Sequence, residues 1–268
     1  MLHQSLPKLK KKTSKSEKKN LKSRIPRIST RGFYDLKNGK AILGKSYMLY
    51  PKNFFECLGD FSEFTIMIHG LRNNKSGALT KFQIAQKRLR QLGYKFPVVG
   101  FSYDSNTKGV QYKSQVVKAT NVGRIIAKKN GANLARFILD SKKKNPNTKI
   151  RLIGHSLGSE VIVYTIDKLK HHKGIIESAY FFGGSVPADM INPQKFGKAI
   201  QNTIRQKLTN YFSPYDDVLK FAYQYGLIEK PIGYTGADGK TVPKYTQKQV
   251  KPRNHRFASY AITLNQYP

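Results

Sequence analysis

Short apolar runs alternate with helical patterns along most of the sequence, and this alternation limits the fold more than any other feature. Each run ends in glycine, serine or aspartate. The runs occupy residues 64–70, 96–104, 149–156, 177–185 and 208–216, and the helical patterns between them occupy 79–93, 123–144, 158–172 and 197–206. Near-continuous apolar strands that are each followed by a helix predict an α/β fold, a mostly parallel sheet with helices on both faces. Functional residues in such a sheet lie at the carboxyl ends of the strands.

The first 31 residues differ from the rest of the chain in composition. They contain eleven Lys and Arg residues, two prolines and no aromatic residue, which is typical of a disordered basic tail. Aromatic residues appear from Gly32 onward, and residues 32–43 predict a hairpin that turns at Asn38-Gly39. We therefore expect a tail over residues 1–31 and a single domain over residues 32–268.

The formal net charge of +34 predicts attraction to polyanions, either nucleic acid or an anionic membrane surface. A lysine-rich composition with a solvated surface is the alternative interpretation. Cys57 is the only cysteine, so no intramolecular disulfide can form. No apolar signal-peptide region follows the basic N-terminus, and no run has the roughly 20 apolar residues of a spanning helix. The sequence therefore predicts a cytoplasmic protein, either free or peripheral at an anionic membrane surface.

The sequence Gly154-His155-Ser156-Leu157-Gly158 joins a strand-like run to a helical pattern. A sharp turn at this point forces the serine backbone into a strained conformation, and only small residues at Gly154 and Gly158 avoid clashes. The hydroxyl of Ser156 would then stand clear of the sheet at the start of the helix. The G-x-S-x-G pattern is weak by itself, and its place between a strand and a helix makes Ser156 a candidate nucleophile.

With this motif the chain resembles the α/β-hydrolase superfamily, and the resemblance covers nearly all of residues 32–268. That family places its nucleophile after the fifth strand, an acid after a later strand and a histidine last. His255 is the only histidine that follows both Ser156 and the candidate aspartates, so the resemblance implies that it is the base. His171 and His172 lie at a lysine-rich helix end, and we interpret them as solvated.

The acid is expected where residues 208–216 end and a helical stretch begins. Asp216 and Asp217 lie there, and helix capping is the alternative interpretation of either one; one aspartate would cap the helix while the other orients the histidine. The segment is similar to a branch of the superfamily, the transmembrane-and-coiled-coil-domain proteins, in which serine and then aspartate precede an apolar pair. The matching residues here are Ser213, Asp216, Val218 and Leu219. This similarity favours Asp216, with Asp217 and then Asp189 as alternatives.

The resemblance also implies an oxyanion hole made by the backbone N–H groups of Leu157 and Leu71. Leu157 directly follows the serine. Leu71 follows His69 and Gly70 in the loop after the run at 64–70. We interpret His69 as a buried residue that orients this loop.

These residues predict a serine hydrolase of the esterase or lipase type, which cleaves carboxylic esters through a Ser-His-Asp triad and an acyl-enzyme. Residues 186–206 are too few for a large apolar lid, so we expect no large cap domain and an open site for small or surface-presented esters. No metal-ligand spacing is present, and we expect no metal and no cofactor. The alternative is a non-catalytic protein of hydrolase fold that binds nucleic acid or an anionic membrane through its basic surface.

Overall fold

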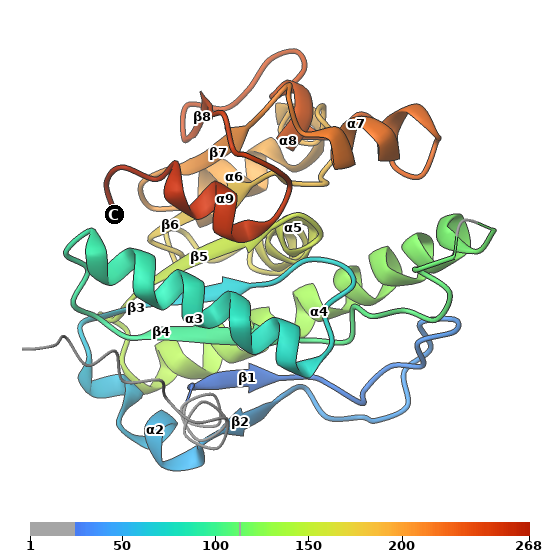
Figure 1. Cartoon of the computed structure of the whole chain (residues 1–268). Helices are drawn as coiled ribbons and strands as arrows, with labels where there is room; N and C mark the ends of the chain where they lie inside the picture. Colours follow the sequence, from blue (N-terminus) through green and yellow to red (C-terminus); the bar gives the residue numbers. More distant parts are fainter. Residues whose placement is uncertain (1–24, 113) are drawn as a thin grey trace, which may run out of the picture.

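The strand-like runs pair into one eight-stranded sheet in the computed structural model, which describes residues 25–112 and 114–268 (Figure 1). The order is β2-β1-β4-β3-β5-β6-β7-β8, and all neighbours are parallel except β1 and β2. The strands are β1 (Arg27–Ser29), β2 (Met48–Tyr50), β3 (Glu63–Ile68), β4 (Val98–Ser102), β5 (Lys149–His155), β6 (Ser178–Phe182), β7 (Leu208–Phe212) and β8 (Tyr245–Gln249).

The helices connect these strands. They are α2 (Lys52–Glu56), the 3-10 helix η1 (Leu58–Asp60), α3 (Lys75–Gln91), α4 (Val116–Lys144), α5 (Gly158–Lys168), the π-helical turn η2 (Pro193–Gly197), α6 (Lys198–Thr203), α7 (Asp217–Gln224), α8 (Ile232–Thr235) and α9 (Phe257–Ile262). In the described part of the chain, no helix has both the length and the apolar character that crossing a membrane requires.

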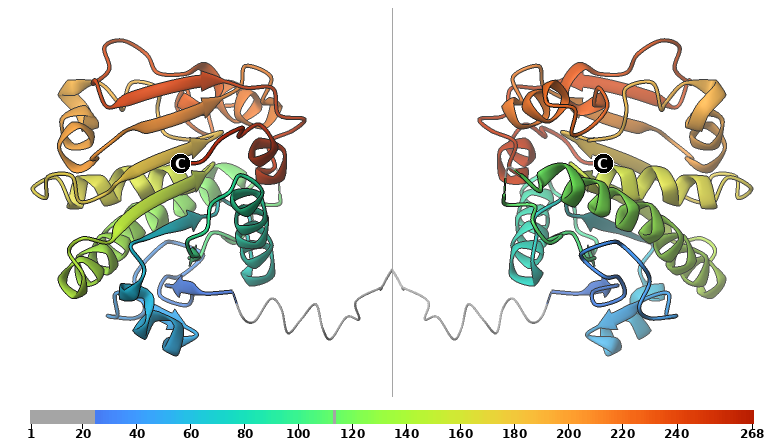
Figure 2. Two further views of the ribbon diagram at one scale, coloured as in Figure 1. Left: turned by 90° about the vertical axis from the view of Figure 1, so that its left-hand side faces the viewer. Right: turned by 90° about the vertical axis from the view of Figure 1, so that its right-hand side faces the viewer.

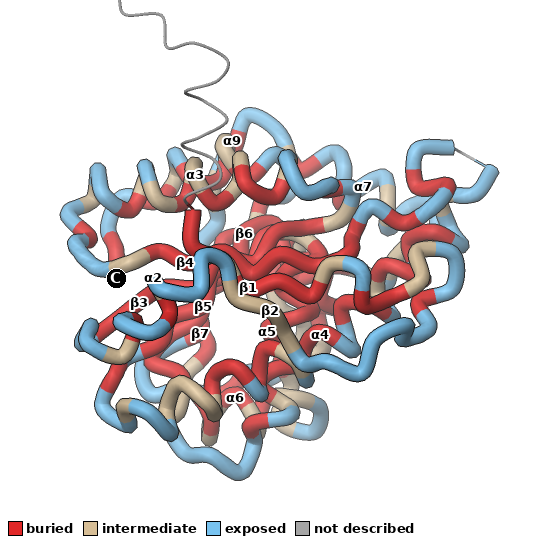
Figure 3. The backbone as a smooth tube through the Cα atoms, turned by 90° about the horizontal axis from the view of Figure 1, so that it is seen from below, coloured by how far each residue is buried: buried red, intermediate tan, exposed pale blue. Residues whose placement is uncertain are grey.

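The sheet has an apolar cluster on each face, because alternate strand residues point to opposite sides. Phe64, Ile66 and Ile68 of β3 belong to the cluster that α4 and α5 cover, whereas Met67 belongs to the cluster that α3 and α9 cover. Figure 2 shows these helices on either side of the sheet. In Figure 3 the central strands are buried along nearly their whole length. This burial on both faces explains why the central strands are near-continuous apolar runs.

The predicted α/β fold is confirmed. The five predicted runs contain β3, β4, β5, β6 and β7, and the four helical patterns overlap α3, α4, α5 and α6. Helix α4 begins at Val116, seven residues before the predicted start. Between β6 and β7 the described chain forms only η2 and α6 as helices, so no large cap covers the sheet there.

The domain begins before residue 32, which corrects the predicted boundary of the tail. Ile25 and Ile28 are buried, and residues 27–29 form β1, which lies parallel to β4. The strand is difficult to recognise in the sequence because cationic residues are frequent around it, although Ile28 in the strand and Ile25 just before it are buried in the core. The prediction of a disordered tail over residues 1–24 lies outside the described residues. The predicted hairpin at 32–43 forms a turn with one antiparallel bridge, Tyr34 with Ala41, and no paired strands.

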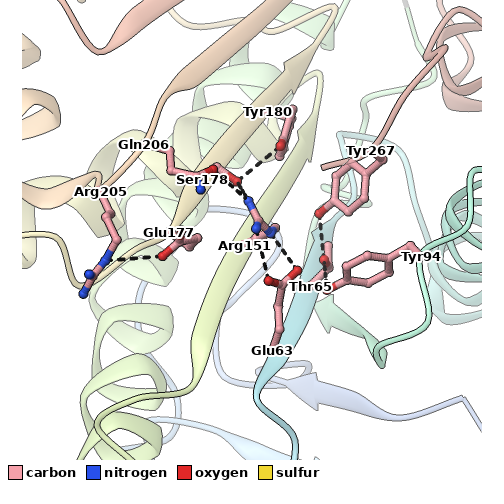
Figure 4. A network of polar contacts seen from close by, with 10 residues as sticks. All are labelled: Glu63, Thr65, Tyr94, Arg151, Glu177, Ser178, Tyr180, Arg205, Gln206 and Tyr267. Atoms are coloured by element: carbon pink, nitrogen blue, oxygen red, sulfur yellow. Dashed lines mark hydrogen bonds and ion pairs between the residues drawn. The ribbon is translucent and has the colours of Figure 1, made fainter.

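A buried polar network ties together the amino ends of the central strands (Figure 4). Arg151 of β5 donates through Nε and a terminal nitrogen to the two carboxylate oxygens of Glu63 on β3, at 2.7 and 3.0 Å. The other terminal nitrogen donates to Ser178 Oγ on β6 at 2.8 Å. Bidentate pairing of this kind fixes the relative register of three parallel strands. The network lies at the edge of the sheet opposite to Ser156.

Candidate active site

Ser156 occupies a strained turn between β5 and α5. Its φ angle is +52°, one of two positive values among the described residues other than glycine. The turn is tight on both sides: a Cβ on Gly158 would lie 2.4 Å from the carbonyl oxygen of Ile68, and one on Gly154 would lie 2.8 Å from the Ile162 side chain. The residue types predicted for a nucleophile elbow are therefore the ones that this backbone can accommodate.

The structure brings Ser156, His255 and Asp216 together in one hydrogen-bonded chain. The Ser156 hydroxyl lies 3.0 Å from Nε2 of His255. Nδ1 of the same ring lies 2.7 Å from Oδ2 of Asp216. A carboxylate only accepts hydrogen bonds, so the proton is assigned to Nδ1, and Nε2 is left free to accept the serine proton. His255 comes from the loop between β8 and α9, and Asp216 from the end of β7.

Asp216 uses both carboxylate oxygens. Oδ2 also accepts a hydrogen bond of 2.6 Å from the hydroxyl of Tyr260, while Oδ1 accepts the Leu219 N–H and so caps α7. Burial by itself raises the pKa of Asp216, but the bonds from His255, Tyr260 and Leu219 outweigh burial and lower the pKa below its ordinary value. One aspartate therefore caps the helix and holds the histidine, whereas the sequence suggested that two residues divide these tasks.

The alternative acids lie apart from His255. Asp217 is exposed as the first residue of α7. Asp189 pairs with Lys195 at the surface. His171 and His172 are exposed after α5, as the sequence suggested. Neither aspartate has a hydrogen bond to a histidine in the described part of the chain.

The loop after β3 lies against the serine. A Cβ on Gly70 would lie 2.8 Å from Cβ of Ser156 and 2.9 Å from the carbonyl oxygen of His155, so only glycine fits here. The next residue, Leu71, lines the same cavity as Ser156 and Leu157. Among the described residues the N–H groups of Leu71 and Leu157 have no hydrogen-bond partner. Both predicted oxyanion donors thus lie on segments beside the serine.

His69 fixes the orientation of the Gly70–Leu71 peptide. Its Nε2 accepts from a guanidinium nitrogen of Arg31 at 3.2 Å and from the Tyr103 N–H at 3.3 Å, so Nδ1 carries the proton and donates to the Gly70 carbonyl oxygen at 3.0 Å. Because C=O and N–H point in opposite directions in a trans peptide, this bond turns the Leu71 N–H away from His69. Burial, followed by the charge of Arg31, lowers the pKa of His69 to about 3, which keeps the ring neutral.

His155 holds the backbone of the loop that carries His255. Its Nε2–H donates to the His255 carbonyl oxygen at 2.7 Å. The ring is buried, and burial together with His255 lowers its pKa to about 3. Nδ1 has no hydrogen-bond partner in the described part of the chain, as expected for the unprotonated nitrogen of a neutral imidazole.

Ser156 and His255 line a cavity of about 220 Å³ at the carboxyl edge of the sheet. Its walls are mainly apolar and come from the loop after β3, from the loop before α4, from α4 itself, and from α7 with the loop that follows it: Leu71, Val110, Val116, Val218, Leu219, Phe221, Ala222, Leu227 and Ile228. An ion pair between buried Glu160 and half-buried Arg124, at 3.3 Å, also lines it. The shape suits a mostly apolar group next to the serine hydroxyl.

Sequence reasoning missed four residues that support the site: Arg31, His155, Tyr260 and Asn73. Asn73 donates through Nδ2 to the carbonyl oxygens of Gly70 and Leu71, at 3.0 and 2.8 Å. Of these four residues, only His155 had a signal in the sequence that pointed to the site, because it lies within the Gly154–Gly158 motif. Among residues 25–112 and 114–268, no group of three or more His, Cys, Asp or Glu side chains is arranged to hold a metal ion.

A strained serine after β5, hydrogen-bonded to a histidine and an aspartate that follow it in the chain, lies on a parallel sheet with helices on both faces. These features define the α/β-hydrolase fold. In sequence comparison, a family described as "Protein of unknown function (DUF726)" matches residues 110–237, which include Ser156 and Asp216 but not His255. No protein of curated function matches the sequence significantly.

Several solved structures resemble the chain weakly. A lipase-esterase related protein from Clostridium acetobutylicum ATCC 824 is 12% identical, with 77% of this chain and 91% of that chain covered and a TM-score of 0.39. An α/β serine hydrolase without lid from Xanthomonas campestris is 14% identical, with 75% and 76% covered and a TM-score of 0.41. A serine hydrolase homologue from Coxiella burnetii is 15% identical, with 75% and 81% covered and a TM-score of 0.39.

Proposed function

We propose that the protein is a serine hydrolase that cleaves carboxylic esters, of the esterase or lipase type. The observation that carries the proposal is the continuous chain from Asp216 through His255 to the Ser156 hydroxyl, with contacts of 2.7 and 3.0 Å. An activated serine requires this series of hydrogen bonds, because Nε2 must accept the hydroxyl proton while the carboxylate holds the ring in the correct tautomer.

In the proposed reaction, Oγ of Ser156 attacks the ester carbonyl while His255 takes its proton at Nε2. The negative charge that develops on the carbonyl oxygen is stabilised by the N–H groups of Leu157 and Leu71. His255 then gives the proton to the leaving alcohol. Water, deprotonated by the same nitrogen, cleaves the acyl-enzyme and restores Ser156. Asp216 stabilises the imidazolium in both halves of the reaction.

The apolar lining of the cavity supports a substrate whose acyl group is apolar. The cavity volume of about 220 Å³ lies below the usual range of drug-sized sites, which is roughly 300–1,000 Å³. We propose small esters, or esters whose remaining chain stays outside the protein at a surface.

A fluorophosphonate probe tests the proposal, because it reacts with an activated serine. We expect the wild type to be labelled and the Ser156→Ala and His255→Ala variants to be unlabelled. Ser76→Ala is the matched control, since Ser76 is exposed on α3, and it should label like the wild type. A panel of p-nitrophenyl esters of rising chain length would then define the acyl preference.

Absence of labelling in a folded wild type would contradict the hydrolase proposal. The net charge of +34 would then favour the second candidate, a non-catalytic protein of hydrolase fold that binds nucleic acid or an anionic membrane. Retention on heparin at increasing salt would test that candidate. Both functions can also coexist, because the basic surface would bring the enzyme to its substrate.

A further inference from the structure

Exposed apolar side chains occur on the segments that line the Ser156 cavity and directly beside its lining residues in sequence. Seven of them lie at residues 112–117 and 215–225, and we call this set the rim: Tyr112, Val117, Tyr215, Val218, Phe221, Tyr223 and Tyr225. Their side chains are between 42% and 68% exposed. Scattered exposed apolar residues are normal, but a group of this size on two adjoining segments indicates an interaction surface.

The rim continues the apolar lining of the cavity to the outside. Val218 and Phe221 belong to both, and Val116 lines the cavity directly beside Val117. Leu219 is the only buried residue of α7, so most of this helix faces solvent. Figure 1 shows α7 and the first turns of α4 extending on the same side of the sheet. A group bound along the rim would therefore lie next to the cavity that holds Ser156.

Cationic side chains stand among the rim residues. Lys118, Lys220 and Lys251 are exposed, and Nζ of Lys251 lies 5.8 Å from the centre of the Tyr215 ring. Asp217 and Glu229 are exposed acidic residues close to the rim in sequence, and Glu229 lies 3.6 Å from Arg124, which also pairs with the buried Glu160 of the cavity wall. Apolar and aromatic side chains interspersed with lysines are the composition of surfaces that enter the headgroup layer of a membrane.

We propose that the rim docks the protein on an anionic phospholipid membrane, with α7 and the first turn of α4 in the headgroup layer. Val117, Val218 and the continuity with an apolar cavity favour lipid over a single-stranded nucleic acid, which is bound by aromatic stacking platforms along a positively charged groove. The benefit of this docking, delivery of acyl esters to Ser156, rests on the proposed function. The docking itself does not require a reactive serine.

The test measures partition of the full chain into vesicles of phosphatidylcholine with about 30% phosphatidylserine, by co-flotation, in the Ser156→Ala background. The rim variant is Val117→Ser/Tyr215→Ser/Tyr225→Ser, which changes no charge and no residue that lines the cavity. The matched control is Phe96→Ser/Ile262→Ser, two exposed apolar residues outside the rim. Circular dichroism and thermal unfolding check that all variants are folded.

We expect the rim variant to lose partition at least about tenfold while the control stays within about twofold. Part of the wild-type binding should persist at about 0.5 M NaCl, where charge attraction is screened but apolar insertion is not. Equal binding of rim variant and wild type, or complete loss of wild-type binding in high salt, would overturn the proposal. A rim variant that changes the oligomeric state in light scattering instead would assign the rim to self-association.

Activity separates this proposal from the proposed function. In the Ser156-containing protein, the rim variant should hydrolyse a soluble short ester at the wild-type rate but a vesicle-borne ester several-fold more slowly. Loss of vesicle binding in the rim variant, with probe labelling intact, would support both the rim proposal and the proposed function. Vesicle binding that the rim variant loses, in a protein that the probe never labels, would support the rim and contradict the hydrolase.

Discussion

Tyr260 supports the proposed reaction without touching the serine. Its hydroxyl donates to Oδ2 of Asp216, the same oxygen that His255 contacts, and its ring packs where Gly183 leaves room. A Cβ on Gly183 would lie 2.9 Å from this ring, and the φ angle of that residue is +51°. The carboxylate is thus fixed from two sides, and its direction toward His255 depends on both.

Replacing Tyr260 by Phe removes one bond to a buried carboxylate. We expect kcat/KM for a soluble ester to fall about tenfold, because a hydrogen bond to a charged group contributes roughly 1.5–3 kcal/mol. The acid limb of the pH profile should move to higher pH, since Asp216 loses a bond that lowers its pKa. Tyr47→Phe is the matched control: it removes a 2.7 Å bond to Asp140 away from the site and should leave kcat/KM unchanged. An unchanged profile in Tyr260→Phe would contradict the positioning role.

At the scale of elements, the five central strands β3 to β7 were predictable, whereas β1, β2 and β8, at the two ends of the strand order, were not. The central strands are buried on both faces, so their sequences are apolar along their length. Strand β8 (Tyr245–Gln249) is largely polar, and β1 lies in a cationic segment. Strands β1 and β8 form because their backbones hydrogen-bond to neighbouring strands. Those neighbours are distant in sequence, so the local residue pattern does not predict the pairing. Helix α8 begins just before the glycine-rich stretch 233–240, and its Gly233 packs on Gly184.

The candidate site followed the same division. Ser156 was predictable because its glycine-flanked turn lies between a strand-like run and a helical pattern, which is local information. Asp216 and His255 were predicted from the order of residues that the family resemblance implies. The bonds from Arg31 to His69 and from His155 to the backbone of His255 join residues far apart in the sequence. Such contacts are decided by packing, so the pattern of residues alone does not reveal them.

The network at the amino ends of the strands should contribute to stability rather than to chemistry. Glu63→Met leaves the buried Arg151 charge unpaired, and we expect the free energy of unfolding to fall by about 3–5 kcal/mol. Arg136→Gln breaks an exposed pair with Asp140 and should cost less than about 1 kcal/mol. Urea denaturation gives both values. Adding Arg151→Met to Glu63→Met should recover part of the loss, and no recovery would contradict the unpaired-charge explanation.

For the whole molecule, two buried neutral histidines link stability to pH. His69 and His155 have pKa values lowered to about 3 by burial, whereas both protonate near pH 6.5 in the unfolded chain. Between these pH values the unfolded state binds more protons than the folded state. Stability is therefore complete above about pH 6.5 and decreases as the pH falls toward 3.

We expect the free energy of unfolding to decrease by about 2 kcal/mol per buried histidine between pH 7 and pH 5. Urea titrations across this range measure the slope. The His155→Asn variant should have a shallower slope, because one of the two groups is removed. The His171→Gln/His172→Gln variant changes two exposed residues and should keep the wild-type slope. A His155→Asn slope equal to that of the wild type would show that this ring does not carry the pH dependence.

The position of β1 decides where the basic segment can be cut from the domain. Composition changes at residue 32, but Ile28 is buried in the sheet and Arg31 donates to His69. A truncation to residue 32 would remove a strand and the guanidinium that holds the loop beside Ser156. Inactivity of that shortened protein would reflect damage to the loop after β3, and it would be wrong to attribute the inactivity to lost positive charge. A deletion that stops at residue 24 removes the lysine-rich segment and leaves β1 and Arg31 in place.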